Sequence, residues 1–391
     1  MEWSIVSLNV LQVVPAVAAR YGGPSTAILG MCRALREAGV STLVATTDAD
    51  GSGRLSVPLG ETTDYRGVPM IFFRRHGTEA FKFSTGISGW LRLNVKRFQL
   101  VHVHAVFSHA CLAAGRACRM NGVPYIVRPL GNLDPWSLKR HAWRKQALMR
   151  LGVERLLTGA DAMHYTTDEE MRLAESGLSL PRGVIVPLGI DEACFRERCP
   201  SPAPYVLSLG RLDEKKGIDR LIGAVHHVAA RNPASDWSVV IAGDGDPRYV
   251  SRLRQLAQNG PGSGRMRFCG WVEGPAKLRL LSGASLYVLP SYQENFGIAV
   301  AEAMAARVPV LVTPGVNLKD QIAASGAGWV VPNDSSSLAN ALQEAMRDPV
   351  ELARRGERAG RLAEQFRWAH VGRRLDAMYR RIVAEPISQT A

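Results

Sequence analysis

The sequence has no long uninterrupted run of apolar residues. Its 391 residues are 46% hydrophobic and 21% charged, but apolar stretches such as Val10–Pro15 are short. A membrane-spanning helix needs roughly 18 apolar residues in a row, so we expect none. The composition also excludes disordered and collagen-like chains.

Cysteine is scarce and irregularly spaced. The six cysteines include no Cys-x-x-Cys pair, so neither a zinc site nor a redox pair is indicated. We interpret them as reduced thiols, which are typical of the cytosol. The apolar N-terminus carries Glu2 and no Lys or Arg before Arg20, so it lacks the positively charged start of an export signal. We therefore expect a cytoplasmic protein.

Acidic residues are nearly missing from one long segment. Residues 66–155 contain sixteen lysines and arginines but only Glu79, Asp134 and Glu154 as acids. This segment therefore carries a charge equal to the net charge of the whole chain, +13. Such a concentration of positive charge predicts a polyanionic partner, which is nucleic acid, an anionic lipid surface or a phosphorylated substrate.

The length predicts two domains, because a single hydrophobic core rarely grows beyond roughly 250 to 300 residues. Short apolar runs alternate with segments of helical periodicity in both halves, which predicts parallel sheets covered by helices on both faces. The aperiodic, proline-rich stretch Pro187–Pro204 separates the two series. We predict an α/β protein with two doubly wound, Rossmann-like domains facing one cleft, residues 1–197 and 198–367. Residues 368–391 are expected to form a C-terminal helix that crosses back to the first domain. The predicted strands lie at 10–15, 42–45, 68–73, 100–103, 125–127, 162–164 and 184–186, and then at 205–209, 238–242, 266–268, 286–289, 310–312 and 329–331.

Residues that directly follow the predicted strands are candidates for ligand binding, since doubly wound sheets bind ligands beyond the carboxyl ends of their strands. Gly22 and Gly23 follow the first strand and would let a diphosphate approach a helix N-terminus, although a plain turn explains them equally well. Gly243 ends another strand and is small enough to admit a nucleotide.

Two cations follow the first strand of the second half. Arg211 and Lys216 lie in a loop that enters a helix near Gly217. Two fixed positive charges at this point would stabilise an anionic leaving group. A solvated basic loop is the alternative interpretation.

The most informative segment is the strand-to-helix junction around Glu294. Glu302 lies about two turns into the helix that follows, so both carboxylates can face one cleft. The backbone amides at the helix start would point at a bound anion. They belong to Asn295, Phe296, Gly297 and Ile298. The junction thus combines acceptors for hydroxyl groups with donors for phosphate.

These motifs resemble those of retaining glycosyltransferases with the GT-B fold. The family in question is the large family 4, which includes sucrose synthase-like enzymes and bacterial mannosyltransferases. The resemblance spans nearly the whole chain and rests on Tyr21-Gly22-Gly23-Pro24, Gly210-Arg211 with Lys216-Gly217, Gly243-Asp244-Gly245, and Glu294 and Glu302 with seven residues between them. It implies an enzyme that moves a hexose from a nucleotide sugar, GDP- or UDP-linked, with mannose slightly favoured and no further cofactor.

The resemblance also assigns roles to the matching residues. Arg211 and Lys216 would neutralise the donor diphosphate. Glu294 would hold hydroxyls of the transferred sugar, and Glu302 would hold the ribose. The histidine of the family's first-domain site falls in Val101-His102-Val103-His104, where His104 is nearest the carboxyl end of the strand. We place His104 near the sugar, with a buried structural histidine as the alternative.

No metal is implied. Asp48-Ala49-Asp50 resembles the Asp-x-Asp metal motif of the other glycosyltransferase fold, but it lies in a Gly-rich loop without the rest of that pattern, so we interpret it as a turn. Arg211, Lys216 and the helix start would stabilise the departing diphosphate instead. The chain has Pro187-Leu188-Gly189 where the family often has Pro-Asn-Gly, so the polar role of that asparagine is absent.

The segment Arg128–Trp136 resembles a Pro-x-Gly-x-Leu-x-Pro-Trp pattern. The pattern occurs in a subgroup that builds exopolysaccharide or O-antigen units on lipid diphosphates. The resemblance implies that Arg128, Asn132, Asp134 and Trp136 bind a lipid-linked oligosaccharide, such as a polyprenyl-diphosphate glycan.

The residues that follow have the composition of a helix lying on an anionic surface. Lys139, Arg140, Arg144 and Lys145 are interleaved with apolar residues such as Trp143. We expect peripheral association with the inner face of the plasma membrane. In the alternative interpretation, the aromatic residues are core and only the cations are exposed.

Other function classes stay open. A sugar-nucleotide epimerase of similar architecture would act on the donor without an acceptor. A nucleic-acid-binding protein would use the basic segment, but no binding motif accompanies that segment, so we expect no nucleic acid. A dehydrogenase is disfavoured because no Gly-x-Gly-x-x-Gly follows the first strand.

Overall fold

The computed structural model describes residues 7–140, 142–234 and 236–385. Residues up to Gly189 and those from Trp368 onward form one compact unit, here unit 1, and Ile190–Arg367 form unit 2. In the described ranges, no helix combines the length and the apolarity that crossing a bilayer requires. The first six residues of the segment considered as an export signal lie outside the described residues.

The described part of unit 1 contains an eight-stranded sheet in the order β10-β9-β8-β7-β1-β2-β6-β5. Its strands are β1 (Asn9–Ala16), β2 (Ser41–Thr47), β5 (Thr62–Tyr65), β6 (Val68–Phe73), β7 (Leu100–His104), β8 (Tyr125–Arg128), β9 (Ala162–Tyr165) and β10 (Gly183–Ile185). Neighbouring strands run parallel, and the edge strand β5 is antiparallel to β6. The short strands β3 (Ala49–Asp50) and β4 (Gly53–Arg54) form a separate hairpin.

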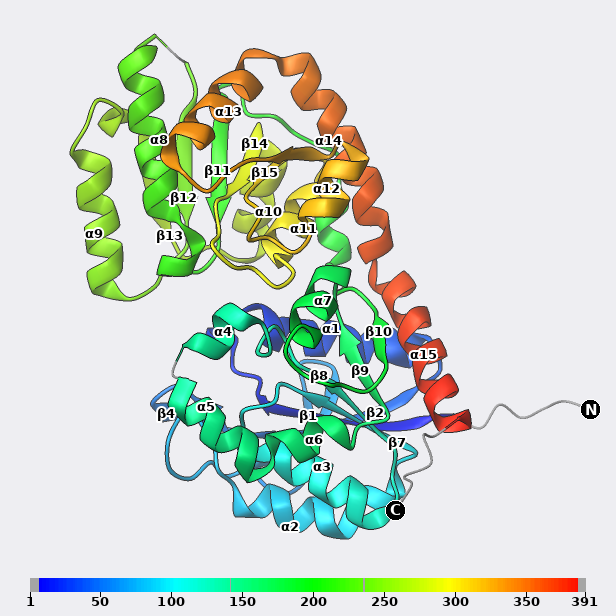
Figure 1. Ribbon diagram of the computed structural model, residues 1–391. Coiled ribbons are helices and arrows are strands. Elements are labelled where there is room, and N and C mark those ends of the chain that lie inside the picture. The colour runs from blue at the N-terminus through cyan, green and yellow to red at the C-terminus, as the bar shows by residue number, and fades with distance from the viewer. Residues whose placement is uncertain (1–6, 141, 235, 386–391) are drawn as a thin grey trace, which may run out of the picture. The chain divides into compact units, whose positions relative to one another are not determined.

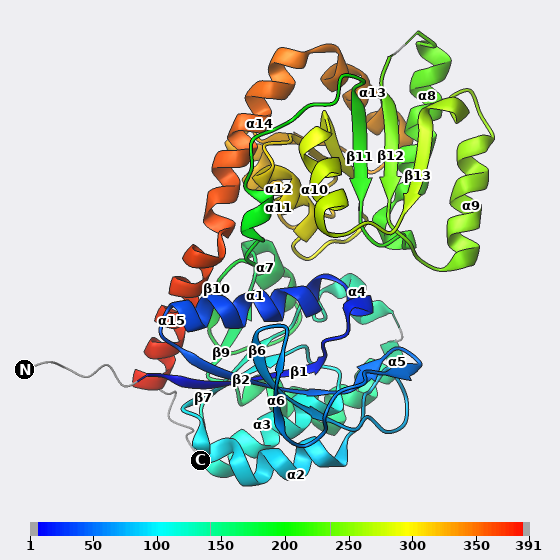
Figure 2. The same cartoon turned by 180° about the vertical axis from the view of Figure 1, so that it is seen from behind.

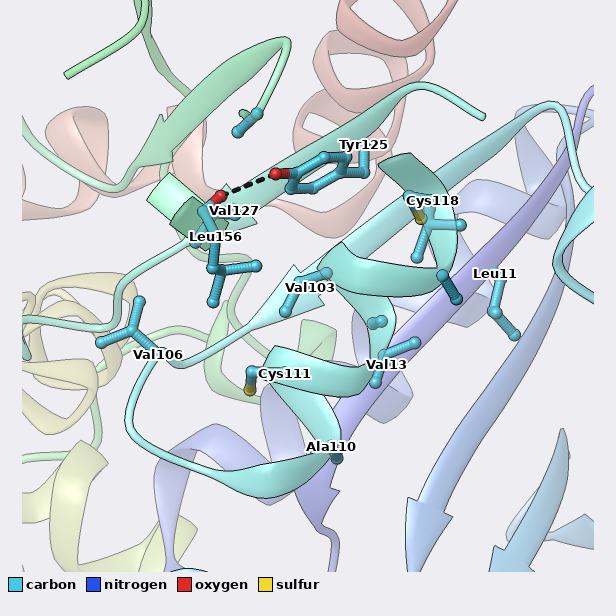
Figure 3. Packing of buried hydrophobic residues seen from close by; sticks show 14 of the residues in the cluster. Leu11, Val13, Val103, Val106, Ala110, Cys111, Cys118, Tyr125, Val127 and Leu156 are labelled. Carbon is cyan, nitrogen blue, oxygen red and sulfur yellow. Dashed lines mark hydrogen bonds between the residues drawn. The ribbon is translucent and has the colours of Figure 1, made fainter. Parts of the chain in front are cut away.

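Helices cover both faces of this sheet (Figures 1 and 2). They are α1 (Gly23–Glu37), α2 (Thr85–Asn94), α3 (His109–Asn121), α4 (Pro135–Lys139), α5 (Ala142–Leu148), α6 (Glu154–Thr158), α7 (Asp168–Glu175) and α15 (Trp368–Ala384). One face of the sheet packs against α2, α3 and α6, and Figure 3 shows part of this cluster around Val103 and Leu156. The other face packs against α1 and α15, which contribute Ile28 and Leu375. The C-terminal helix therefore completes a core that begins with the first strand.

Local sequence explains where these helices begin and end. The Thr167 hydroxyl accepts the N–H of Glu170 at 3.0 Å and caps α7, whose first turn is acidic and suits the positive end of the helix dipole. Gly122 ends α3 with a left-handed φ of 64°, a conformation that glycine adopts without steric cost.

Within its described residues, unit 2 contains a six-stranded, fully parallel sheet in the order β13-β12-β11-β14-β15-β16. The strands are β11 (Tyr205–Leu209), β12 (Ser238–Ala242), β13 (Met266–Gly270), β14 (Leu286–Leu289), β15 (Val310–Val312) and β16 (Gly328–Val330). The helices are α8 (Ile218–Arg231), α9 (Pro247–Gln258), α10 (Gly274–Gly283), α11 (Ile298–Ala305), α12 (Lys319–Ser325), α13 (Ser335–Arg347) and α14 (Pro349–Ala363). A core cluster joins the sheet to α8, α9 and α13.

The predicted fold class, two doubly wound Rossmann-like domains, is confirmed. Each predicted strand coincides with an observed strand to within two residues at either end. The edge strand β5 and the hairpin of β3 and β4 were not predicted.

Candidate active site

The candidate residues of unit 2 leave its sheet where the strand order changes. From β11 the chain runs outward to β12 and β13, and it then returns to β14 on the opposite side of β11. Ligands of doubly wound sheets bind beyond the carboxyl ends of the strands at such a point. The loop of Arg211 and Lys216 follows β11, and the loop of Glu294 follows β14.

The loop after β11 is held against the end of β14 by a glycine. Asp213 caps a short 3-10 helix, Glu214–Lys216, by accepting a backbone N–H at 3.1 Å. The next residue, Gly217, has a left-handed φ of 65°, and a Cβ there would lie 2.1 Å from the carbonyl oxygen of Pro290. Glycine therefore brings Lys216 beside the residues that follow β14. Arg211 lies in the same loop and is exposed.

A second glycine contact joins the loops after β11 and β12. A Cβ on Gly243 would lie 1.8 Å from the carbonyl oxygen of Gly210. The loops also exchange a backbone hydrogen bond, in which Leu212 donates to the carbonyl of Asp244 at 2.9 Å. The structure thus requires glycine at 243 for packing between the loops.

Glu294 and Lys216 form an ion pair in which Nζ donates a hydrogen bond to Oε2. Their side chains are 15% and 17% exposed, respectively. Burial acts to raise the pKa of Glu294, but the charges of Lys216 and Lys215 and a hydrogen bond from the Gly297 backbone outweigh it, so the pKa lies below its ordinary value. Glu294 is therefore an ionised carboxylate that can accept hydrogen bonds from hydroxyl groups.

The start of α11 adds positive polarity to the same junction. Gly297 precedes the helix with a left-handed φ of 77°. The unpaired N–H groups at a helix start and the helix dipole attract anions. Asn295 and Ile298 are half-buried here. The side chain of Phe296 is 3% exposed and packs edge-on against Phe366, with ring centroids 5.3 Å apart, so Phe296 offers a ligand its backbone.

Glu302 lies further along α11 and has its own cation. Oε1 accepts from Nζ of Lys277, on α10, at 2.6 Å. Burial raises the pKa of Glu302, and the charge of Lys277 opposes this. Lys277 was not predicted from the sequence, because a residue 25 positions away in another helix leaves no spacing signal.

In unit 1, the strand order changes between β1 and β7. Gly22, with φ of 74°, forms the turn after β1, and Gly23 starts α1. His104 ends β7, is 2% exposed and is hydrogen-bonded through Nε2 to Oε1 of Gln12 at 2.8 Å. Burial and the nearby charge of Arg128 hold the pKa of His104 well below its ordinary value.

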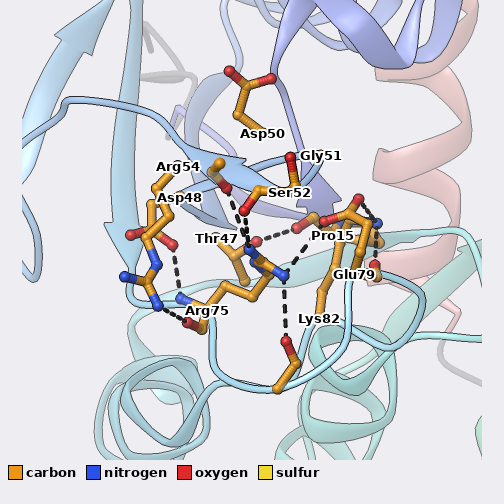
Figure 4. A network of polar contacts seen from close by, with 12 residues as sticks. Pro15, Thr47, Asp48, Asp50, Gly51, Ser52, Arg54, Arg75, Glu79 and Lys82 are labelled. Atoms are coloured by element: carbon orange, nitrogen blue, oxygen red, sulfur yellow. Dashed lines mark hydrogen bonds and ion pairs between the residues drawn. The ribbon is translucent and has the colours of Figure 1, made fainter.

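Contacts of Tyr21 fasten the glycine turn to the loops of Gly51 and Glu79. Figure 4 shows the polar network around Arg75 to which Glu79 belongs. The Tyr21 hydroxyl donates to Glu79 at 2.5 Å and accepts from the backbone N–H of Gly51 at 2.9 Å. Glu79 also pairs with Lys82 at 2.9 Å and with Arg75 at 3.7 Å. Burial and Glu79 raise the pKa of Tyr21 to about 12, so the hydroxyl keeps its proton.

Both carboxylates of the Asp-x-Asp segment are engaged in this region. Asp48 accepts the backbone N–H of Arg75 at 2.7 Å and pairs with Arg74 at 3.4 Å, and Asp50 pairs with Arg20 at 3.3 Å. In the residues that the structure describes, no group of three or more His, Cys, Asp or Glu side chains is arranged to hold a metal ion.

The candidate acceptor residues differ in exposure. Arg128 is 2% exposed at the end of β8, and burial lowers its pKa to about 10. Asn132 donates to the carbonyl of Pro129 at 2.6 Å, and Asp134 caps α4 by accepting the N–H of Trp136 at 2.7 Å. Trp136 is 40% exposed. Asn132 and Asp134 therefore shape the loop, while Trp136 faces solvent.

The basic segment exposes both charges and aromatic rings. Lys139, Arg140 and Arg144 are exposed, and Trp143 is 70% exposed with the guanidinium of Arg144 over its ring. Lys145 differs, because it is half-buried and donates to the Ser137 carbonyl at 2.5 Å. Burial lowers the pKa of Lys145. Lys145 therefore connects α5 to α4, while the other three cations face solvent.

Comparisons with known proteins agree with the fold. Residues 22–189 match the family model "Glycosyl transferase 4-like domain", and residues 190–363 match "Glycosyl transferases group 1". A phosphatidyl-myo-inositol mannosyltransferase of Mycolicibacterium smegmatis is 32% identical over 204 residues, which cover 50% of this chain and 51% of that protein. The chain thus spans about half the length of that relative. A GDP-mannose-dependent monoacylated alpha-(1-6)-phosphatidylinositol monomannoside mannosyltransferase of Corynebacterium glutamicum is 27% identical, with 68% of this chain and 72% of that protein covered.

Solved structures show the same fold. Sucrose-phosphate synthase from Thermosynechococcus elongatus superimposes with a TM-score of 0.77 at 20% identity, covering 96% of this chain and 99% of that one. Anabaena Alr3699/HepE in complex with UDP and glucose superimposes with a TM-score of 0.75 at 17% identity, covering 96% and 100%. The chain is therefore a glycosyltransferase with the GT-B fold, built from a glycosyl transferase 4-like domain and a glycosyl transferases group 1 domain.

Proposed function

We propose that this enzyme transfers a hexose from a nucleotide sugar to a glycan acceptor with retention of anomeric configuration. The observation that carries the proposal is the Glu294–Lys216 pair at the start of α11, where a carboxylate for sugar hydroxyls lies beside a cation and helix amides for a diphosphate. Two relatives are named as mannosyltransferases, which favours mannose as the sugar and GDP as the nucleotide over UDP-linked hexoses.

The proposed chemistry breaks the bond between the anomeric carbon and the diphosphate oxygen. Lys216, Arg211 and the amides of α11 stabilise the charge that develops on the diphosphate, and one such donor is worth about 10²- to 10³-fold in rate. The acceptor hydroxyl attacks on the face that the diphosphate leaves, and its proton passes to the departing diphosphate oxygen. Protein cations supply the positive charge, so the proposed reaction needs no metal.

Three further residues are assigned to the donor. Glu302, held by Lys277, would accept hydrogen bonds from the ribose hydroxyls, and Gly243 would lie beside the nucleotide. His104 of unit 1 is assigned to the transferred sugar. The motif resemblance supports these roles.

The proposed acceptor carries phosphate and a lipid, as in a polyprenyl-diphosphate glycan. Two lines support this: relatives named for phosphatidylinositol or inositol phosphate acceptors, and the excess of cations in residues 66–155. Trp136 and Arg128 are the proposed acceptor contacts. The exposed cations Lys139, Arg140 and Arg144, with Trp143, would hold the enzyme at an anionic membrane, since each adjacent cation contributes about 1 kcal/mol.

Thermal-shift measurements with EDTA present test the donor site. UDP, GDP, UDP-glucose and GDP-mannose are added to the wild type, to Glu294→Ala and to the control Glu357→Ala. The control removes a carboxylate that is 54% exposed and pairs with Arg307. We expect one nucleotide class to raise the Tm, and the sugar to add a further rise that Glu294→Ala loses and Glu357→Ala keeps. Absence of any shift at millimolar ligand contradicts the donor site, and a shift that requires added Mg²⁺ contradicts metal independence.

Sedimentation with vesicles of phosphatidylglycerol and phosphatidylcholine tests the membrane surface. Replacing Lys139, Arg140 and Arg144 by glutamine should weaken binding by roughly 10²-fold, the sum of three cation contributions. The matched control replaces three exposed arginines of unit 2 by glutamine, namely Arg248, Arg252 and Arg347. Equal effects of the two triple variants would rule out a specific membrane face.

A further inference from the structure

A chain of hydrogen-bonded side chains runs through the face of the unit 1 sheet that packs against α15. It joins Tyr379 of α15 to Gln12 of β1, to His102 and His104 of β7, and to His164 of β9. Four of these side chains are 0% exposed and His104 is 2% exposed. Water therefore does not compete for these hydrogen bonds.

The direction of each hydrogen bond in this network follows from the one at its His164 end. The carbonyl oxygen of Val186 can only accept, so Nε2 of His164, at 2.8 Å, must carry a proton. In a neutral imidazole the other nitrogen, Nδ1, then accepts. The partner of Nδ1 is Nε2 of His102, at 3.2 Å, which must donate. Nδ1 of His102 is then an acceptor for the Tyr379 hydroxyl at 2.7 Å.

The donors and acceptors between Tyr379 and His104 are assigned in the same way. The Tyr379 hydroxyl uses its one proton in the hydrogen bond to His102, so it accepts from the amide Nε2 of Gln12 at 3.2 Å. The amide oxygen of Gln12 therefore faces His104 and accepts from its Nε2 at 2.8 Å. A flipped amide would place two acceptors, its own oxygen and that of Tyr379, against each other without a proton.

This assignment of donors and acceptors holds only for neutral histidines. The surroundings of the three rings keep them neutral. Burial is the main cause that lowers the pKa of His102, His104 and His164, and the charge of Arg128 adds to it. The pKa of His164 falls to about 3. All three rings thus carry one proton each across the physiological pH range.

We propose that Tyr379 and Gln12 are positioning residues that fix His104 as the tautomer with a proton on Nε2 and an unprotonated Nδ1. Within the described residues, no side chain or backbone group is hydrogen-bonded to His104 Nδ1. His104 therefore offers a substrate an acceptor for a hydroxyl proton. Helix α15 determines this property through the hydroxyl group of Tyr379. The proposal rests on the proposed function only for the assignment of His104 to the sugar.

NMR of the free enzyme tests the tautomer without any donor or acceptor. The chain has nine histidines, and long-range ¹H–¹⁵N spectra of ¹⁵N-histidine-labelled protein report the protonation of each ring nitrogen. Signals are assigned in the wild type through correlations between each ring and its own backbone resonances. In the wild type, His102, His104 and His164 should all be protonated at Nε2 and unprotonated at Nδ1. A proton on Nδ1 of any of the three would overturn the proposal, even if no variant folds.

Tyr379→Phe removes the hydroxyl that orients the amide of Gln12. Its matched control is Tyr125→Phe, because Tyr125 is equally buried in unit 1 and donates to the Leu156 carbonyl at 2.8 Å on the other face of the sheet (Figure 3). We expect the His104 nitrogens of Tyr379→Phe to shift toward a mixture of tautomers, while Tyr125→Phe keeps the wild-type values. Identical His104 signals in the two variants would refute the positioning role.

Turnover separates this proposal from the proposed function. If the NMR results hold and His104→Ala keeps wild-type turnover of the donor found by thermal shift, the assignment of His104 to the sugar is wrong and the hydrogen-bond chain stands. If His104→Ala is inactive, Tyr379→Phe should lower kcat roughly fivefold to tenfold with little change in KM, the cost of one neutral buried hydrogen bond.

Discussion

Replacing Lys277 by methionine should leave Glu302 buried without its cation. Removing one partner of a fully buried pair costs about 3–5 kcal/mol. The side chain of Lys277 is 26% exposed and that of Glu302 is 10% exposed, so water relieves part of this cost. We expect the free energy of unfolding to fall by about 1–3 kcal/mol, the range for a buried group that loses its partner.

The same change should weaken nucleotide binding. Burial already raises the pKa of Glu302, and losing Lys277 raises it further, so part of the population becomes protonated. A hydrogen bond from ribose to a carboxylate is worth about 1 kcal/mol more than one to a neutral acid, so we expect binding of UDP or GDP to weaken by up to about fivefold in calorimetry. Lys277→Arg keeps the charge and should bind normally.

The loss of stability in Lys277→Met should depend on pH with a defined sign. A carboxyl whose pKa is higher in the folded state than in the unfolded state stabilises most at low pH, and this contribution is lost as pH rises through the folded pKa. The Tm difference between Lys277→Met and the wild type should therefore narrow from pH 8 toward pH 5. Adding Glu302→Gln to Lys277→Met should restore most of the Tm. A gap that does not change with pH, or a double variant without recovery, would refute the reasoning.

Three further predictions follow from the site and the surface. Lys216→Met should lower kcat by about 10²-fold or more, because it removes the cation at the diphosphate. Exchange of the exposed Arg231 for methionine should leave kcat unchanged. An unchanged steady-state kcat in Lys216→Met would exclude Lys216 from the mechanism. Gly217→Ala should lower the Tm more than Gly122→Ala. Both glycines have left-handed φ values, 65° and 64°, but only at position 217 would the new Cβ meet a backbone oxygen. Equal Tm values of the two variants would contradict this packing. Vesicle binding should fall steeply as salt rises from 0.1 M to 1 M, where the Debye length drops from about 10 to 3 Å, and salt-independent sedimentation would argue against an electrostatic surface.

The sequence predicted the fold because buried parallel strands are nearly continuous apolar runs. β14, for example, is Leu286–Leu289 with every residue buried, and its limits coincide with the predicted ones. The strand β5 was missed because Thr62–Tyr65 is a partly exposed, polar edge strand that lacks an apolar run. Membership of a glycosyltransferase family was also predicted and is confirmed by the family models.

The candidate site was only partly predictable. Residues such as Glu294 directly follow strands, and the topology of a doubly wound sheet places them together. The partners that fix the charge or proton of a site residue are distant in sequence, as Tyr379 is from His102, and no local pattern indicates them. Lys145 shows the converse, because its sequence neighbours suggest an exposed helix face while its side chain packs over Phe107 and bonds to Ser137. The roles of the individual site residues stay predictions.

The return of the chain to unit 1 at Trp368 has a consequence for biosynthesis. All 178 residues of unit 2 emerge from the ribosome before the helix that closes the first sheet. At about 5–20 residues per second, the nascent N-terminal half waits roughly 10 seconds or more with part of one sheet face uncovered. Val371, Leu375 and Tyr379 then arrive together. Ribosome stalling near Arg367 would therefore leave an intermediate that exposes apolar residues of this sheet and is prone to aggregate.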